Sequence, residues 1–408
     1  MSERANEPVV IVGAGPVGMT SALALNARGV PSIVLEKDPE DRERDGSRAI
    51  YIHGSTLQAW ERAHPTLGTR IVDDGLVWPT RRTYYNGKEV FSRSYSTPGG
   101  TGDIPHFTSI PQVWTEDHLH DAVEEADIPI HWDSAVERVE SSEDGVIVET
   151  EDGDQWETDY VIGADGGGSV VRKEIGAEFE GDQSENAYII SDLEKLENDP
   201  LPEERVFHYN HPDAGGRNIL LVPFAGGWRL DIQCEDDEDP EVLSNDANMR
   251  KFVRDIMGPE YEDRITWVST YYFLQVMADR FIDEHRRVLL AGEAAHLLAP
   301  FGARGMNSGV ADADEAASAI TVARQSQTEA VRADEIELYA ARREKAAEFN
   351  IDAAGQALRH LRDDGLETKL KKRLAAAMAP YYEPAGEWLD DAPYGPHEAP
   401  PIVSTLEY

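Results

Sequence analysis

The N-terminal region combines two short apolar runs with a helical pattern between them. Residues Pro8 to Val12 are continuously apolar, which is typical of a strand buried on both faces. Apolar positions recur at helical spacing from Val17 to Arg28, and Ser32 to Leu35 form the second run. The first 36 residues therefore predict one strand–helix–strand unit of a parallel sheet.

Alternating patterns in two later regions predict antiparallel strands. Between 74 and 107, Gly, Pro and aromatic residues are frequent and Asn86-Gly87 indicates a hairpin. From 185 to 272 the pattern is mostly that of strands, and residues 218–234 form the clearest hairpin around a Gly-rich turn. These two regions predict a second, mainly antiparallel sheet.

The remaining patterns predict a helix, further strands and a helical C-terminal part. Gln112 to Glu125 has helical spacing. Strands are expected at Val146 to Thr150, Trp156 to Gly163 and Arg287 to Ala291. An Ala-rich helical stretch follows from about 308 to 378, punctuated by Gly355 and Gly365.

Charge limits the partners and the environment of the chain. Its 408 residues include 78 Asp and Glu against 38 Lys and Arg, a net charge of −40. No basic excess is present to displace counterions, so we expect no nucleic-acid or anionic-membrane partner. Acid is spread over every segment, which predicts a protein of a halophilic organism, because molar salt screens charges within ~3 Å.

Other features of the composition place the protein in the cytoplasm and argue against a metal site. No run approaches the ~20 apolar residues of a membrane span, and the N-terminus lacks the zones of a signal peptide. The single cysteine, Cys234, forbids an internal disulfide and cannot alone hold zinc. We expect it to be a small core residue, and we predict no metal ligands.

A glycine string joins the first strand to the first helix. Gly13, Gly15 and Gly18 form G-x-G-x-x-G, in which the second glycine lets a pyrophosphate approach the backbone. The helix N-terminus offers an anion site. Glu36 ends the next strand, where a carboxylate can bind a ribose. This arrangement predicts a dinucleotide-binding unit.

Two further strand-to-turn strings decide the family resemblance. They are 161–172 (VIGADGGGSVVR) and 287–296 (RVLLAGEAAH), and the similarity continues through 298–307 (LAPFGARGMN). With the first string they resemble the three fingerprints of class A flavoprotein monooxygenases, the para-hydroxybenzoate hydroxylase-like group. The resemblance covers about two thirds of the chain.

The resemblance implies a set of FAD-binding residues, and no catalytic side chain can be named. The set contains Gly13, Gly15, Pro16, Val17, Gly18, Glu36, Lys37, Arg48, Gln112, Asp165, Gly166, Glu293, Pro300, Gly305, Met306 and Asn307.

Within this set, the family pattern assigns distinct roles. Arg48 is expected to reach the pyrophosphate, and Gln112 the ribityl side; either could instead be a surface or helix-cap residue. Asp165, which has few purely structural uses in so glycine-rich a string, would serve both FAD and the nicotinamide donor. Residues 305–307 would place backbone groups against the pyrimidine ring, and Pro300 would line the substrate side.

One departure from the family pattern concerns Glu293, where the family usually has Asp accepting a ribityl hydroxyl bond. The longer side chain can accept that bond only if the backbone adjusts. His296, in the same string, is expected to stabilise a turn rather than act as a base.

The implied fold is α/β, with a Rossmann-like FAD-binding domain, an inserted mainly antiparallel substrate domain and a helical C-terminal portion. We expect the FAD-binding domain to comprise 1–73, 108–180 and 273–378. The substrate domain would comprise 74–107 and 181–272, and 379–408 would be a C-terminal tail. Candidate pocket residues are the side chains His208, Tyr209, Trp228, Tyr271 and Tyr272, which are equally ordinary as strand-core residues.

The implied activity is hydroxylation of an aromatic or similarly activated small molecule, using NADH or NADPH and O2 through a flavin C4a-hydroperoxide. The alternatives are a reductase or dehydrogenase of the geranylgeranyl reductase type, without oxygen insertion, and a non-catalytic flavin-binding sensor. The chain is expected to be a monomer or a homodimer. Its sequence does not identify the substrate.

Overall fold

A computed structural model of the protein describes residues 7–44, 49–95, 104–235, 237–362 and 365–396. One half of the molecule contains a five-stranded parallel sheet with the order β17-β11-β1-β2-β7. Its strands are β1 (Val9–Val12), β2 (Ser32–Leu35), β7 (Ile130–His131), β11 (Val161–Gly163) and β17 (Val288–Leu290). The three predicted strings follow β1, β11 and β17, so they begin at three neighbouring strands.

Both faces of this sheet are buried, which explains the continuous apolar runs. Val9 and Ile11 pack on one face against helices, whereas Val10 and Val12 pack on the other against a three-stranded sheet. The helices are α1 (Pro16–Ala27), α2 (Gly54–Ala63), α3 (Leu67–Asp74), α4 (Gln112–Glu125) and α8 (Arg304–Gln325). The small sheet comprises β8 (Val136–Ser142), β9 (Gly145–Thr150) and β10 (Gln155–Thr158).

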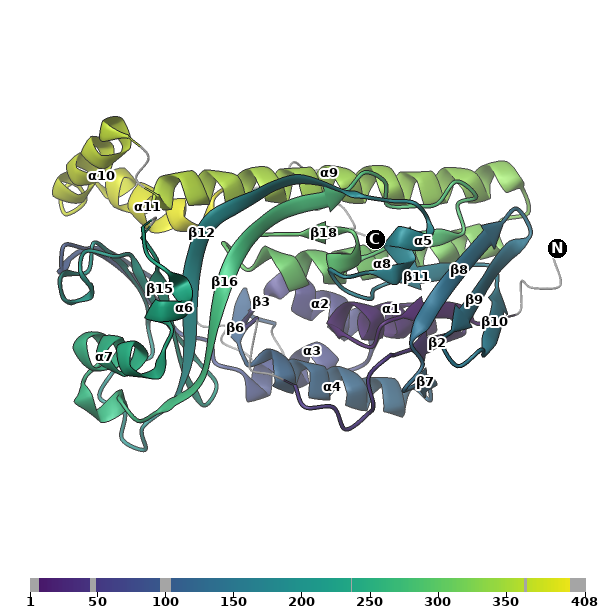
Figure 1. The fold of residues 1–408 in the computed structure, drawn as a ribbon, viewed down its shortest axis with the longest axis horizontal. Coiled ribbons are helices and arrows are strands. Elements are labelled where there is room, and N and C mark those ends of the chain that lie inside the picture. The colour runs from purple at the N-terminus through teal and green to yellow at the C-terminus, as the bar shows by residue number, and fades with distance from the viewer. Residues whose placement is uncertain (1–6, 45–48, 96–103, 236, 363–364, 397–408) are drawn as a thin grey trace.

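The other half is built on an eight-stranded sheet with the order β18-β16-β12-β15-β14-β13-β4-β5 (Figure 1). Its strand pairs are antiparallel except for β13 and β4. The strands are β4 (Thr80–Tyr85), β5 (Lys88–Ser94), β12 (Phe179–Glu194), β13 (Arg205–Tyr209), β14 (Ile219–Phe224), β15 (Gly227–Gln233), β16 (Ile265–Ala278) and β18 (His296–Leu297). Both predicted hairpins are present, as β4–β5 and β14–β15.

The long strands β12 and β16 run side by side from one half of the molecule to the other (Figure 1). One face of their sheet packs on the short helices α6 (Pro240–Leu243) and α7 (Asp246–Ile256). The other face packs on residues of the C-terminal helices and of the segment after β18. This second face is therefore the one turned toward the parallel-sheet half.

The C-terminal helices differ in two ways from the expected pattern. Helix α9 (Glu329–Leu361) continues without interruption through Gly355. The helical stretch is interrupted before α10 (Leu366–Met378), whose N-cap residue Gly365 has φ +92. Helix α11 (Glu383–Asp391) lies within the predicted tail and packs on β4 and β5. Tertiary packing allows a glycine within a long helix, at a cost of about 1 kcal/mol.

The single strand expected from Trp156 to Gly163 is wrong, because two strands of different sheets occupy this stretch. β10 pairs antiparallel with β9, and β11 pairs parallel with β1. The chain turns between them at Thr158, whose hydroxyl donates to the carbonyl oxygens of Pro8 at 2.8 Å and Tyr160 at 3.1 Å.

The remaining short elements connect the two halves or close turns. They are β3 (Tyr51–His53), β6 (Phe107–Ser109), α5 (Val170–Glu174) and the 3-10 turns η2 (Pro212–Ala214), η3 (Pro259–Tyr261), η4 (Gly292–Ala294) and η5 (Ala392–Tyr394). The predicted α/β architecture with an antiparallel-rich second sheet and a helical C-terminal part is confirmed. Among the described residues, no helix is both long enough and apolar enough to cross a bilayer.

Candidate functional site

The turns that follow three neighbouring strands meet at one edge of the parallel sheet. A Cβ atom on Gly13, after β1, would lie 2.5 Å from the carbonyl oxygen of Ala164, after β11. A Cβ atom on Gly309 of α8 would lie 2.6 Å from Val17 and 3.1 Å from Gly292, after β17. The three strings therefore form one surface at the carboxyl ends of the strands, where open α/β sheets bind ligands.

The turn between β1 and α1 leaves room for a ligand at one position. A Cβ atom on Gly18 would clash with the carbonyl oxygen of Gly13. At Gly15, by contrast, φ is −78, which any residue adopts, and a Cβ atom would meet nothing within 4 Å. Packing does not require glycine there, whereas a pyrophosphate against the backbone would.

The N-terminus of α1 is available to an anion. The helix begins with Pro16 and Val17, and it has neither a side-chain cap nor an acidic residue in its first turn. The partial positive charge of the helix N-terminus therefore lies beside Gly15.

The predicted ribose-binding carboxylate, Glu36, lies directly against the first turn. Glu36 is buried, and its Oε2 accepts a 2.6 Å hydrogen bond from the backbone N–H of Ala14. Its Oε1 accepts a bond from the N–H of Asp38 at 3.1 Å and lies 3.2 Å from Nη1 of Arg42. The adjacent Lys37 is exposed.

Asp165 has a structural role at the start of α5. Its Oδ1 accepts a 2.6 Å bond from the hydroxyl of Ser169, and its Oδ2 accepts bonds from the N–H groups of Val170 and Val171 at 2.7 and 3.2 Å. Gly166, with φ +77, completes the turn. The carboxylate thus fixes the second string, and its predicted role toward cofactors stays a prediction.

The side chain of Asn307 is engaged within the protein. Its Oδ1 accepts bonds from the N–H of His53 at 2.9 Å and from the hydroxyl of Thr56 at 2.7 Å. Its Nδ2 donates to the carbonyl oxygens of Tyr51 at 3.0 Å and Ala303 at 2.7 Å. These bonds tie α8 to β3 and α2, and they occupy both polar atoms of the side chain.

The start of α8 resembles the start of α1 in being open. No side chain caps it, and no acidic residue lies in its first turn. A Cβ atom on Gly305 would meet nothing within 4 Å, and Met306 packs against the core of the parallel-sheet half. The side chains of Glu293 and Pro300 are exposed.

A buried hydrogen-bond network around Asp312 holds the third glycine string in place. Nε2 of His296 and Oδ2 of Asp312 are 2.7 Å apart, and the same oxygen accepts a 2.9 Å bond from the N–H of Gly292. Nε of Arg343 donates to Oδ1 at 2.6 Å. Burial alone would raise the pKa of Asp312, but Arg343 and His296 outweigh it and lower the pKa to about 2. His296 therefore lies in a structural network, away from solvent.

Gln112 lies beside a segment that includes one predicted ligand. Its Oε1 accepts a 3.0 Å bond from the N–H of Ala49, and its Nε2 donates to Glu116 at 2.8 Å. Arg48, predicted to reach the pyrophosphate, lies outside the described residues.

A family comparison identifies the nucleotide that this surface fits. The sequence model of the family described as "FAD binding domain" matches residues 6–354 of the chain, a range that contains all three strings. The chain belongs to the FAD binding domain family. FAD is therefore the cofactor that fits the open backbone at Gly15 and Gly305 and the uncapped starts of α1 and α8.

Two relatives of this FAD-family chain are monooxygenases by name. Rifampicin monooxygenase of Streptomyces venezuelae is 26% identical over 317 residues, which are 75% of this chain and 62% of that protein. A flavin-dependent monooxygenase of Mycobacteroides abscessus is 30% identical over 329 residues, 75% of this chain and 65% of that protein. The chain thus spans less than two thirds of the length of these relatives.

A solved structure confirms the fold of this FAD-family chain. The p-nitrophenol 4-monooxygenase PnpA from Pseudomonas putida DLL-E4 aligns with a TM-score of 0.77 and 22% identity. The alignment covers 96% of this chain and 99% of PnpA.

The five side chains suggested for the pocket wall lie in different environments. Trp228 is buried on the sheet face covered by α7, away from the FAD-binding half. Tyr209 and Tyr271 belong to the cluster on the opposite face. His208 stacks on a neighbouring tyrosine, and Tyr272 is 43% exposed.

The sequence analysis missed polar groups on the face turned toward the FAD-binding half. Arg205 is 1% exposed, and its Nε and Nη1 have no hydrogen-bond partner among the described residues. Oδ1 of Asp231 is likewise buried without a partner in that part of the chain. Arg205 is on β13 and Asp231 is on β15, with β14 between them. Both lie on the face that holds Tyr188, whose ring is 5.9 Å from that of Phe301.

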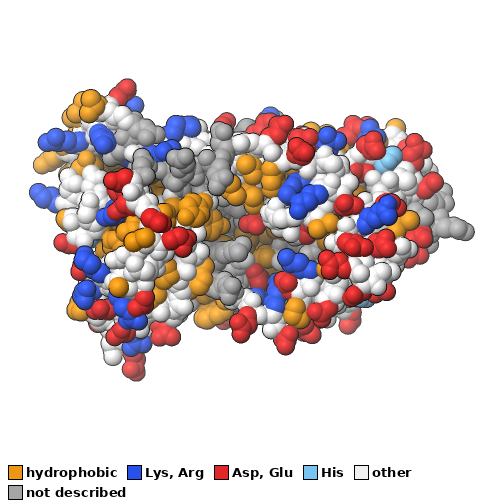
Figure 2. Space-filling view, in the orientation of Figure 1, with side chains coloured by type: hydrophobic (Ala, Val, Ile, Leu, Met, Phe, Trp, Pro, Cys, Tyr) orange, Lys and Arg blue, Asp and Glu red, His pale blue; other side chains and the backbone are white. Residues whose placement is uncertain are grey.

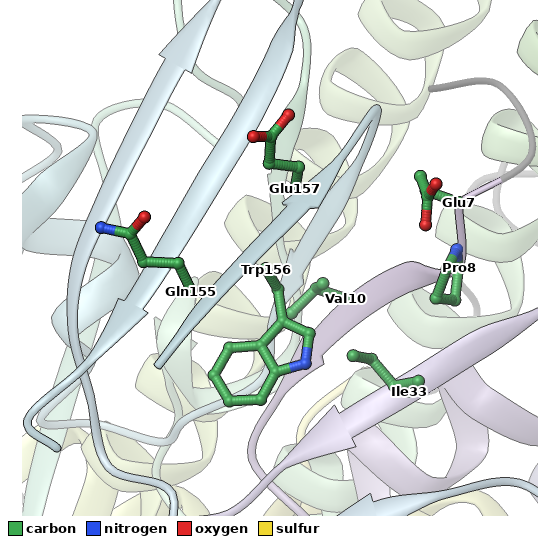
Figure 3. A pocket seen from close by; sticks show the side chains of 7 residues that line it. All are labelled: Glu7, Pro8, Val10, Ile33, Gln155, Trp156 and Glu157. Atoms are coloured by element: carbon green, nitrogen blue, oxygen red, sulfur yellow. The ribbon is translucent and has the colours of Figure 1, made fainter. Parts of the chain in front are cut away.

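A hollow of about 530 Å3 lies elsewhere, between the parallel sheet and β10 (Figure 3). Trp156 forms one wall, opposite Val10 and Ile33, and Glu7 and Pro8 lie at its rim. These residues lie toward the amino ends of the parallel strands, so the hollow is remote from the glycine turns. It is not the predicted cofactor surface.

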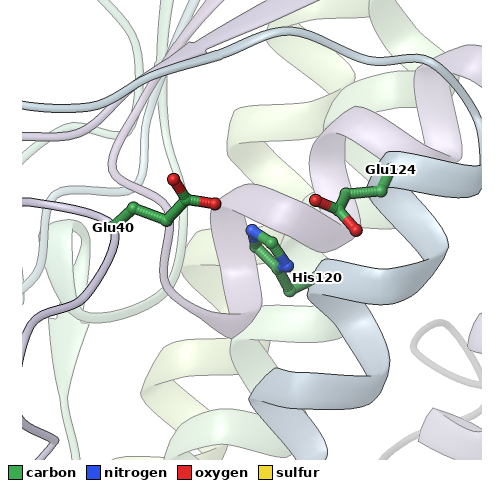
Figure 4. Close-up of side chains that lie close together, drawn as sticks. All are labelled: Glu40, His120 and Glu124. Carbon is green, nitrogen blue, oxygen red and sulfur yellow. The ribbon is translucent and has the colours of Figure 1, made fainter.

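One group of side chains has the composition of a metal site. Potential ligand atoms of Glu40, His120 and Glu124 lie within 4.8 Å of one another (Figure 4). His120 and Glu124 are one turn apart on α4, and both glutamates are exposed. In a chain with 78 acidic residues such proximity is expected on the surface, and it supports no metal assignment.

The single cysteine has the environment expected of a core residue. Cys234 is 4% exposed within the apolar cluster between the eight-stranded sheet and α7. Burial raises the pKa of its thiol to about 11, so the reactive thiolate is disfavoured.

Proposed function

We propose that the protein is an FAD-dependent monooxygenase that hydroxylates an aromatic or similarly activated small molecule with NADH or NADPH and O2. The observation that supports this most is the convergence of the three glycine strings on one surface beside the eight-stranded sheet. The names of the two relatives point to the same reaction class. FAD, when bound, supplies the redox and oxygen chemistry.

The chain itself must hold the cofactor, orient the substrate and exclude water. In our proposal the backbone at Gly15 and the start of α1 receive the pyrophosphate, and Glu36 binds the adenosine ribose. Glu293 accepts a ribityl hydroxyl bond, and the backbone of 305–307 contacts the flavin ring. The substrate lies beside the segment around Phe301, where that segment meets the sheet face that contains Tyr188.

Two alternatives remain distinguishable by experiment: a flavin reductase without oxygen insertion and a non-catalytic flavin-binding sensor. We place the protein in the cytoplasm, as a monomer or homodimer, with a small molecule rather than nucleic acid as its partner. The excess of 78 acidic over 38 basic residues supports the exclusion of nucleic acid.

The decisive experiment follows reduction of the flavin by NADH or NADPH under anaerobic conditions, with and without a panel of phenols. A hydroxylase of this design should reduce its flavin slowly alone and faster with substrate, because substrate binding favours the flavin position that meets the nicotinamide. A tenfold acceleration needs only about 1.4 kcal/mol of differential binding. Isotopically labelled O2 should then appear in the product.

The alternatives give different results in the same assay. Fast reduction without any phenol, with saturation of an added alkene and no labelled oxygen in any product, would indicate a reductase. Absence of NAD(P)H consumption with every compound would indicate a sensor.

A further inference from the structure

Helix α10 carries an apolar stripe that the described part of the chain leaves uncovered. Leu366, Leu370, Leu374 and Met378 recur every four residues, and they are 88%, 58%, 54% and 48% exposed. Residues four apart advance by only about 40° around a helix, so the four side chains form one stripe. A surface helix normally turns such a stripe toward the core. In α10 the stripe faces outward.

The orientation of α10 is set by its opposite face. Ala375 and Ala376 are buried in the apolar cluster that also contains Tyr209 and Leu389. Lys372 is 2% exposed, and its Nζ lies 5.3 Å from the centre of the Tyr209 ring. The stripe therefore belongs to a helix that is packed on the protein by its other side.

Exposed apolar side chains are concentrated at this end of the molecule. Half of the large hydrophobic side chains that are exposed among the described residues lie between 366 and 388, and they include Tyr381, Tyr382 and Trp388. Helix α10 lies at one end of the long axis (Figure 1), where apolar side chains appear beside those of Lys and Arg (Figure 2). A gathered apolar patch of this kind marks an interaction site.

Basic side chains flank the stripe. Helix α10 contains Lys369, Lys371, Lys372 and Arg373, whereas Glu367 is its single acidic residue. Three of the nine lysines of the chain thus lie within four positions, in a protein with a net charge of −40. The helical turn places Lys369 and Arg373 on one side of the stripe and Lys371 on the other. These three side chains are exposed, and none has an ion-pair partner among the described residues.

Basic residues of another exposed helix, α7, do have acidic partners. Lys251 lies 2.8 Å from Asp255, and Arg254 lies 3.2 Å from Glu262. The three flanking cations of α10 lack such partners in a chain that has 78 acidic residues. They are therefore available to an anionic group of another molecule.

This charge pattern distinguishes among the possible partners. In a two-fold pair of α10 helices the same surface would meet itself, so the cations of one copy would approach those of the other. An anionic lipid surface has the complementary properties. Helices that lie in a membrane surface insert leucine and aromatic side chains at the boundary of the acyl chains, while Lys and Arg beside them contact anionic headgroups.

We propose that the outward face of α10 binds the surface of an anionic membrane. The leucine stripe enters the boundary between headgroups and acyl chains, and Lys369, Lys371 and Arg373 contact lipid phosphates. The expectation of no anionic-membrane partner rests on the net charge of the whole chain. Salt screens charges beyond about 10 Å at 0.1 M, so the remote acidic surface opposes contact less than the local cations favour it. Membrane binding needs no turnover and is independent of the proposed function.

The test measures co-sedimentation of the FAD-loaded protein with lipid vesicles. One set of vesicles consists of phosphatidylcholine, and the other is an equal mixture of phosphatidylglycerol and phosphatidylcholine. Wild type should bind the anionic vesicles at least tenfold more tightly, because each cation near an anionic surface adds to binding. Added KCl should reduce this preference, since salt screens the electrostatic part of the contact.

Two double variants separate the apolar contact from the electrostatic one. Leu370→Gln with Leu374→Gln should weaken binding to anionic vesicles at least tenfold, because two apolar side chains no longer leave water. Lys371→Gln with Arg373→Gln should lose most of the preference for phosphatidylglycerol. Glutamine is a good helix former, so α10 should persist in both variants.

The matched control changes two exposed apolar side chains elsewhere. Val331→Gln with Leu338→Gln alters residues of α9 that are 42% and 44% exposed, and this variant should bind vesicles as wild type does. Retained flavin absorbance and a cooperative melt show that each variant is folded. Sedimentation equilibrium without vesicles gives the mass of each protein in solution.

Three results would overturn the proposal. The first is absence of wild-type binding to the anionic vesicles. The second is equal binding by wild type and the folded Leu370→Gln/Leu374→Gln variant. The third is a wild-type dimer that binds no vesicles and dissociates in that variant, which would assign the face to a second copy of the chain.

Discussion

Arg343 of α9 donates from Nε to Oδ1 of Asp312 in α8 at 2.6 Å, and both side chains are almost completely buried. Asp312 also accepts bonds from the third glycine string, at Gly292 and His296. The pair therefore links two C-terminal helices to the strand end that is predicted to hold FAD. Its loss should affect both stability and cofactor binding.

Asp312→Asn should destabilise the protein by about 3–5 kcal/mol, because it removes the closer anion of the buried Arg343 guanidinium and leaves only Glu315, 3.4 Å from Nη1. Chemical denaturation at neutral pH measures the loss. The control is Asp314→Asn on the same helix. Its partners Arg28 and Arg62 are partly exposed and exposed, respectively, so the change should cost about 1 kcal/mol or less. Equal losses in the two variants would contradict the buried-pair interpretation.

The same carboxylate gives acid sensitivity with a defined sign. The folded-state pKa of Asp312 is lowered from 3.8 to about 2, so the folded state binds this proton less readily than the unfolded chain. Its contribution is fully present above about pH 4 and is lost as the pH falls toward 2. The difference in stability between wild type and Asp312→Asn should therefore shrink over that range.

Gly15→Val should abolish FAD binding and leave the apoprotein folded. Backbone conformation and free space both admit a side chain at this position, so only a ligand against the backbone is displaced. The melting temperature of the apoprotein should be unchanged, while the purified variant should be colourless. Gly15→Ala should fall between wild type and Gly15→Val. A yellow Gly15→Val protein would exclude pyrophosphate contact at this turn.

Glu293→Ala should weaken FAD binding by about 1–3 kcal/mol if the carboxylate accepts a buried ribityl hydroxyl bond. Glu293 is exposed without the cofactor, so the stability of the apoprotein should not change. Glu293→Asp, which restores the shorter acid of the family pattern, should retain binding. Fluorescence titration of the apoprotein with FAD gives the three affinities. Wild-type affinity in Glu293→Ala would show that the family role does not transfer.

Asp231→Asn should increase stability above neutral pH. The pKa of Asp231 rises from 3.8 to about 7 on folding, so the folded state holds a proton that the unfolded chain releases. Stability from this group is present below about pH 4 and is lost as the pH rises through 7. One pKa unit corresponds to about 1.4 kcal/mol. The shift from 3.8 to about 7 therefore limits the stability lost above neutral pH to about 4 kcal/mol. Denaturation curves at pH 5 and pH 8 should converge in the variant.

The glycine strings could be predicted from sequence because their constraints are local. Gly13 needs φ +103, and the helix that follows begins within a few residues. The adjacency of β17, β11 and β1 could not be predicted from sequence, because it depends on pairing between strands that are far apart in the chain. The Thr158 turn was missed for a related reason: its hydroxyl bonds to Pro8, which only the folded sheet brings near.

The polar groups on the sheet face turned toward the FAD-binding half show a second limit of prediction from sequence. In β15, Arg229 and Asp231 alternate with Trp228, Leu230 and Ile232. Such alternation ordinarily predicts a strand with one face in water. Here the charged face is turned toward the FAD-binding half, so the burial of Oδ1 of Asp231 and its effect on the pKa follow from domain packing.

Salt dependence is the broadest prediction, and it tests the origin of the charge of −40. Acidic side chains lie over both halves of the face shown in Figure 2, so repulsion acts across the whole surface. The melting temperature should rise steeply as KCl increases from ~0.1 M to ~2 M, because the Debye length falls from about 10 Å to about 3 Å or less. Sucrose, which strengthens burial without screening charge, provides the control and should stabilise less. A melting temperature that is the same at both KCl concentrations would contradict adaptation to a saline cytoplasm.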